Sequence, residues 1–129
     1  LPIATIMLSK YGDYPEYHTS LDDLSMVTPS GIEGGYTAIQ KAIEIIEKNI
    51  YLKTSVIGEP QLGKRGLYQT LSTKTSGKSV RMMMNFISYC DGKHSLFEIA
   101  EMIKEPFWEL IPIMEKLIDE NLLTVEKSD

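Results

Sequence analysis

The residues with the clearest potential for chemistry lie near the N-terminus, in the run Tyr-His-Thr-Ser-Leu-Asp-Asp at positions 17–23. Imidazole is a common zinc ligand, and a nearby carboxylate can fix its tautomer. His18 is therefore a candidate metal ligand, and Asp22 is a candidate partner for it. A zinc site needs three or four ligands, however, and the sequence has no close pair such as His-x-x-x-His. Taken alone, a single His before Thr-Ser is more typical of an ordinary loop.

The remaining metal-binding residue types add little to this set. Cys90 is the one cysteine of the 129-residue chain, which excludes an internal disulfide and a cysteine-built zinc site. His94 is expected to be a loop residue next to Ser95. A lone cysteine fits a reducing compartment, and no signal peptide or membrane-length apolar run is visible. We therefore expect a cytoplasmic protein with no membrane partner.

The elements that must position His18 read as an α/β fragment over residues 1–50. The apolar run at 2–8 predicts a strand buried on both faces, and turn residues follow it at 9–16. A long amphipathic helix is predicted from Pro29 or Ser30 to about residue 50. Gly34 and Gly35 weaken that helix but allow close packing against a neighbouring element. Its apolar positions recur every three or four residues: Ile32, Tyr36, Ile39, Ile43, Ile46 and Ile50.

The middle of the chain, residues 51–78, is predicted to be a linker with one or two short strands, at 51–57 and 66–72. It carries five basic groups and one acidic group, a net charge of +4. The flanking segments 1–49 and 79–129 carry net charges of −4 and −5. The basic middle, and above all its least generic stretch at 58–68, is therefore the one place where an anionic ligand or an acidic surface could dock.

The last segment, residues 79–129, is predicted to be a small α+β winged helix-turn-helix domain with three helices and a β-prone end. The first helix stops at Asp91-Gly92. Ser95 and Glu98 form a capping box for the second helix. Pro106 opens the third helix and Asn121 ends it.

A winged helix reads DNA through its third helix, and phosphate contacts need Lys or Arg on that surface. The third helix instead carries one basic residue, Lys116. Its acidic residues are Glu109, Glu115, Asp119 and Glu120. Nucleic acid is therefore not expected as a partner. A protein-interaction role, including contact with a second copy of the chain, fits the charge better.

The order of strand, His-Thr-x-x-Asp loop and long helix over residues 2–50 resembles the end of the co-catalytic zinc aminopeptidase family. In that family the same pattern supplies the last metal ligand, which matches His18, with Asp22 at the motif's acidic position. More narrowly, the whole chain is similar to the C-terminal end of bacterial aminopeptidase-like proteins with an appended winged helix-turn-helix domain. Residues 33–36 and 58–68 add to this likeness. Some members of that group lie near surface-polysaccharide biosynthesis genes.

The resemblance implies a hydrolase with two zinc ions, in which metal-activated water attacks a peptide or amide bond. The family's other ligands and its general base, a Glu, lie upstream and match nothing in this chain. The resemblance thus predicts a parent enzyme and an incomplete catalytic set here, so that the chain alone would not hydrolyse a substrate. Two alternatives remain, namely an assembly module without catalysis and a DNA-binding regulator.

Overall fold

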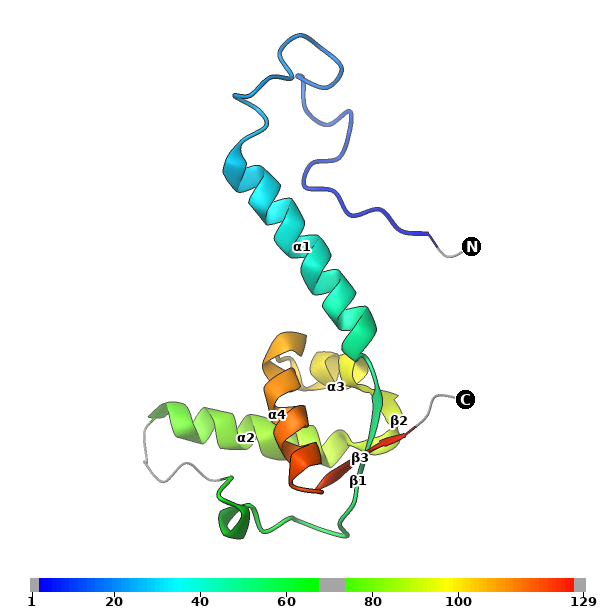
Figure 1. The fold of residues 1–129 in the computed structure, drawn as a ribbon, viewed down its shortest axis with the longest axis vertical. Helices are drawn as coiled ribbons and strands as arrows, with labels where there is room; N and C mark the ends of the chain where they lie inside the picture. The colour runs from blue at the N-terminus through cyan, green and yellow to red at the C-terminus, as the bar shows by residue number, and fades with distance from the viewer. Residues whose placement is uncertain (1–2, 68–73, 127–129) are drawn as a thin grey trace. The chain divides into compact units, whose positions relative to one another are not determined.

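The structure is a computed structural model that describes residues 3–67 and 74–126 (Figure 1). The chain divides into two compact units, Leu1–Ile46 and Glu47–Asp129. The long helix α1 spans Pro29–Lys48, so nearly all of it belongs to the first unit and its last residues belong to the second. Each unit is described separately below.

The first unit consists of α1 and the preceding residues, which form a series of turns. The predicted helix is confirmed, from the first of the two expected start positions. The strand predicted at 2–8 is wrong, because residues 3–8 form no ladder and are exposed. A strand buried on both faces needs hydrogen-bonded neighbours, and the described residues of this unit contain no other strand. An apolar run alone could not reveal that.

The second unit contains a three-stranded antiparallel sheet in the order β2-β1-β3. Strand β1 (Tyr51–Thr54) is central, and it pairs with β2 (Asp91–Ser95) and with β3 (Leu123–Glu126). The segment predicted as a linker therefore supplies the strand that joins the other two. Of the second strand predicted there, residues 68–72 lie outside the described residues.

Three α-helices and one short 3-10 helix complete the second unit. They are η1 (Leu62–Arg65), α2 (Lys74–Tyr89), α3 (Leu96–Ile103) and α4 (Phe107–Asp119). The stop before Asp91-Gly92 is confirmed, and Gly92 has the positive φ of 81° that favours glycine. No helix in the described residues is both long and apolar enough to cross a membrane.

Local signals at the ends of α3 and α4 act as expected. The Ser95 hydroxyl accepts a hydrogen bond from the backbone N–H of Glu98, and the Glu98 carboxylate accepts one from the backbone N–H of Ser95. Pro106 is the N-cap of α4, one position earlier than the first helical turn. Asn121 adopts a φ of 56° just after α4, which ends the helix as predicted.

The core of the second unit lies between the sheet and the three α-helices. Its fully enclosed side chains come from nearly every element of the unit, which ties β1 and η1 to the helices. They are Leu52, Leu62, Phe86, Cys90, Leu96, Ile99, Leu110, Leu117 and Leu122. The described residues of the second unit, 47–67 and 74–126, thus form a packed α+β domain, in agreement with the predicted winged-helix fold class.

Candidate functional site

His18 lies in the turn-rich segment that precedes α1. Its backbone φ is 58°, a region that residues other than glycine enter rarely. Its side chain is exposed, and its ring lies 4.2 Å from the ring of Tyr17 in an edge-to-face arrangement. The Tyr17 ring also lies within 6.1 Å of the rings of Tyr11 and Tyr14, centroid to centroid. The candidate ligand therefore stands at the edge of a small aromatic cluster.

Two polar side chains after His18, those of Thr19 and Asp23, form hydrogen bonds within the loop. The Thr19 hydroxyl donates to the carbonyl of Glu16 at 2.8 Å and accepts from the backbone N–H of Leu21. The Asp23 carboxylate accepts from the hydroxyl and the backbone N–H of Ser25, and these bonds hold the pKa of Asp23 below its ordinary value. These bonds fix the loop backbone on either side of Ser20-Leu21-Asp22.

The carboxylate expected to orient His18, that of Asp22, does not hydrogen-bond to it. Within the described part of the chain, no hydrogen bond or ion pair joins His18 and Asp22. Residues 3–67 and 74–126 also contain no group of three or more His, Cys, Asp and Glu side chains that could hold a metal ion. These residues do not by themselves fit a zinc ion, because such a site needs at least three ligands.

His94 belongs to the second unit, where its partner is local. Its Nδ1 lies 3.1 Å from the Asp91 carboxylate, which also accepts from the backbone N–H groups of Lys93 and His94. These bonds, with that of Lys93 the strongest, keep the pKa of Asp91 below its ordinary value. Both residues lie within β2, so the prediction of a loop position for His94 is wrong, because the pairing of residues 91–95 with the distant strand β1 could not be read from local sequence.

The apolar face of α1 has no cover within the first unit. No described residue of this unit is buried, and large apolar side chains of α1 are about half exposed or more. They are Ile32, Tyr36, Ile39, Ile43 and Ile46. Residues 6–8 lie beside this helix, where they line a small hollow with Gly35, Ala38 and Ile39, and a Cβ on Gly35 would stand 3.5 Å from the Leu8 side chain. The glycine pair does admit a neighbouring segment, as expected, but that segment leaves the side chains of the stripe about half exposed or more.

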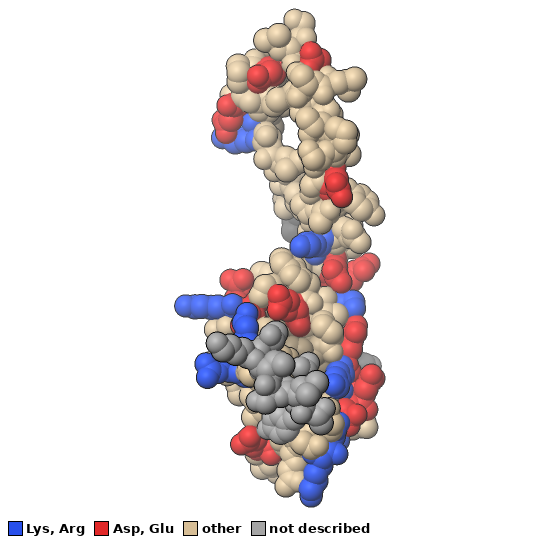
Figure 2. All heavy atoms as spheres, turned by 90° about the vertical axis from the view of Figure 1, so that its left-hand side faces the viewer, with Lys and Arg blue, Asp and Glu red and all other residues tan. Residues whose placement is uncertain are grey.

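The surface of α4 is acidic. Glu109, Glu115 and Asp119 are exposed on it beside the single basic residue Lys116, and Glu115 pairs with Lys48 at 2.8 Å. Figure 2 shows acidic and basic side chains interspersed on the visible face of the second unit. Of the two adjacent aromatic residues, Phe107 is buried and Trp108 is 44% exposed. α4 is the helix that would enter a DNA groove, and its acidic side chains would repel phosphate. Its exposed aromatic side chain is a type found at protein interfaces.

The second unit matches a known protein family. Residues 49–125 match a winged helix-turn-helix family, which is more than half of the chain. The chain belongs to the winged helix-turn-helix family. Residues 1–49 match a second family, a domain of unknown function (DUF4910). The boundary between the two matches falls just after the end of α1.

Two individual proteins extend the likeness to both units. The chain is 36% identical over 102 residues to a Clostridium acetobutylicum protein named "Putative polysaccharide biosynthesis protein with aminopeptidase-like domain". The match covers 78% of this chain and 23% of that protein. A crystal structure from the same organism, described as that of a "putative peptidase", superposes on this chain with a TM-score of 0.71 at 29% identity. The superposition covers 85% of this chain and 24% of the crystallised chain.

These findings confirm the resemblance to aminopeptidase-like proteins that carry a winged helix-turn-helix domain. The chain spans about a quarter of the length of both relatives. The role of His18, the zinc ions and the substrate remain predictions.

Proposed function

We propose that this chain is one part of an aminopeptidase-like hydrolase. In this proposal residues 3–46 complete the hydrolase domain and bring His18 to its metal site. Residues 47–126 form an attached winged helix-turn-helix module that contacts protein. The substrate is a peptide or another amide, as for the parent enzyme predicted from the sequence.

The observation that carries the proposal is the uncovered apolar stripe of α1. An amphipathic helix gains its stability from burying its apolar face, and no described side chain of this one is fully buried within its own unit. Five large apolar side chains on one helix far exceed the scattered exposed residues of an ordinary surface. The relatives are more than three times as long as this chain, so they contain the additional residues that such a face requires.

His18 fits this arrangement as one ligand of a zinc site that other parts of the longer protein complete. Its left-handed backbone supports a special role, because such conformations in residues other than glycine cluster at functional sites. The hydrogen bonds of Thr19 and Asp23 fix the loop, and the Tyr17 ring restricts the imidazole. This chain would then supply the position and orientation of one imidazole, and no further catalytic group.

The winged helix-turn-helix module suits contact with protein. Its third helix is acidic, which opposes the counterion release that drives DNA binding. Exposed Trp108 is the type of residue that anchors protein interfaces. Either another domain of the same protein or a second copy could be the partner.

Zinc analysis of the longer protein tests the proposal. His18→Ala is expected to remove about one zinc ion per chain and to abolish peptidase activity, because the remaining ligands no longer complete that site. His94→Ala is the matched control, since its imidazole is paired with Asp91 in the other unit, and it should keep all its zinc. An unchanged zinc content in the folded His18→Ala protein would contradict the proposal.

A further inference from the structure

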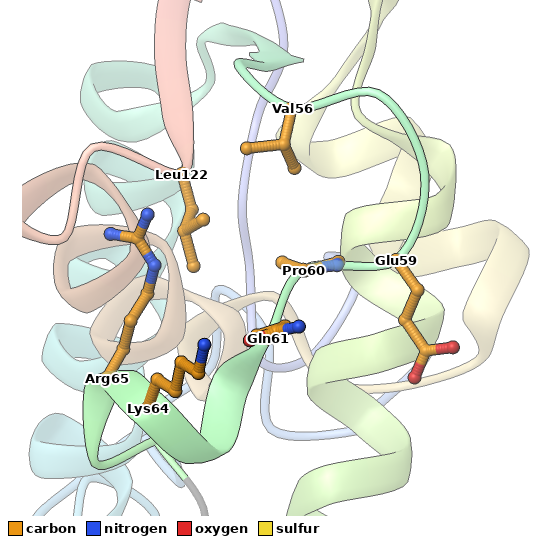
Figure 3. A pocket seen from close by; sticks show the side chains of 7 residues that line it. All are labelled: Val56, Glu59, Pro60, Gln61, Lys64, Arg65 and Leu122. Carbon is orange, nitrogen blue, oxygen red and sulfur yellow. The ribbon is translucent and has the colours of Figure 1, made fainter.

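A hollow of about 410 Å³ lies on the second unit, where η1 faces the end of α4 (Figure 3). Its lining combines apolar and polar side chains, with only one acidic residue among them. The lining residues are Val56, Glu59, Pro60, Gln61, Lys64, Arg65 and Leu122. This volume falls in the range of about 300–1,000 Å³ that is usual for small-molecule sites.

The walls of the hollow are tied to the core. The backbone N–H of Ser55 donates to the carbonyl of Leu122 at 2.9 Å, which joins the segment after β1 to the start of β3. Leu62, the first residue of η1, and Leu67, two residues after its end, are buried. The polar side chains of η1 therefore project from a backbone that packing already holds in place, which lowers the cost of ordering them around a ligand.

The two cationic residues of η1, Lys64 and Arg65, differ in their hydrogen bonds and ion pairs. Arg65 donates to the carbonyl of Glu120 at the end of α4, and its guanidinium stands 3.9 Å from the Glu120 carboxylate. Lys64 forms no ion pair or hydrogen bond within the described residues. In Figure 3 its ammonium points toward Gln61, whereas the carboxylate of Glu59 points away from the other lining side chains. The hollow thus presents one uncompensated ammonium beside an amide and a partly engaged guanidinium.

We propose that this hollow binds a carboxylate carried on an apolar group. Lys64 and Gln61 would donate to the carboxylate, and Val56, Pro60 and Leu122 would contact the apolar part. One uncompensated positive charge matches a monoanion better than a phosphate dianion, which needs more donors. A free acid and the end of a peptide share this chemistry. The proposal does not depend on hydrolase activity.

NMR titration of the 129-residue chain tests this site, with the Gln61 side-chain amide and the backbone amides of η1 as reporters. N-acetyl-leucine should bind saturably and about fivefold more tightly than its uncharged analogue N-acetyl-leucinamide. It should also bind more tightly than inorganic phosphate. A short peptide ending in leucine, compared with its C-terminal amide, distinguishes a peptide end from a free acid.

Charge-matched variants separate the site from a general charge effect. Lys64→Gln should weaken N-acetyl-leucine binding about fivefold. Lys64→Arg should keep most of the affinity, and Lys116→Gln, which removes an exposed charge on α4, should change nothing. Equal affinity for acid and amide, equal loss in the Lys64→Gln and Lys116→Gln variants, tighter binding of phosphate, or no saturable shift would each overturn the proposal.

Discussion

The two units of this chain use the same helical pattern with opposite outcomes. In α1, Ile43 and Ile46 recur at helical spacing and are 50% and 78% exposed. In α4, Leu110 and Leu117 recur in the same way and are fully buried, because α3 and β3 pack against that helix. Amphipathic periodicity therefore predicts that a face needs a partner, and it does not say whether the same chain supplies one.

The contrast bears directly on the candidate metal ligand. The second unit has its own core and carries no group of metal-ligand residues among those described. The first unit carries His18 and has no buried residue among those described. A metal site tolerates little positional error in its ligands, so its support must come from packed surroundings. In the function proposed above, that support comes from the rest of a longer protein.

Thiol chemistry should give the largest difference between the units. Burial, and to a lesser extent the charge of Asp91, raises the pKa of Cys90 to about 12. In an Ile46→Cys variant, the introduced thiol should react with a disulfide reagent at pH 8 about a thousandfold faster than Cys90 does. Two equally fast phases in the folded protein would mean that the second unit is not packed as described.

Side-chain truncation gives the next largest difference. Leu117→Ala removes a fully buried side chain and should lower the free energy of unfolding by about 3 kcal/mol in urea titrations. Ile46→Ala, on the exposed stripe, should change it by less than about 0.5 kcal/mol. Comparable losses in the two variants would show that the stripe of α1 is already buried in this chain.

The smallest effect concerns the pH dependence of the capping box. Hydrogen bonds from the backbone N–H and then the hydroxyl of Ser95 lower the pKa of Glu98. The ionised carboxylate therefore contributes stability that is complete above the ordinary glutamate pKa of about 4.3 and is lost as the pH falls through its lowered value. Glu98→Gln keeps a capping side chain without the charge. The stability difference between wild type and Glu98→Gln should shrink between pH 6 and pH 3, and a constant difference would refute this assignment.

Signals that act within a few residues could be predicted from the sequence. The start of α1, the stop at Asp91-Gly92, the capping box and the end of α4 near Asn121 each depend on local conformational preferences and hydrogen bonds. The His-Thr-x-x-Asp motif at His18 could also be recognised from the sequence, because it is defined by the spacing of neighbouring residues. The adjacent Phe107 and Trp108 must lie on different faces of a helix, and one is buried while the other is exposed.

Features that depend on distant partners could not be predicted. The central place of β1 comes from pairing with β2 and β3, which lie about 40 and 70 residues further along the chain. The apolar run at 2–8 predicted a strand because composition cannot tell whether neighbours exist. The basic stretch around Lys64 was recognisable from its charge, but nothing in the sequence showed that Val56 and Leu122 would lie beside it.

Amide hydrogen exchange of the 129-residue chain tests the central claim most directly. Amides of α1 from residue 34 to 46 should exchange at least about a hundredfold faster than the hydrogen-bonded amides of α4 and β1, since a helix without a buried face opens locally at little cost. That result would show a first unit that requires a partner and a second that does not. Protection of α1 equal to that of α4 would contradict the account, because it would mean that this chain already covers the stripe on its own.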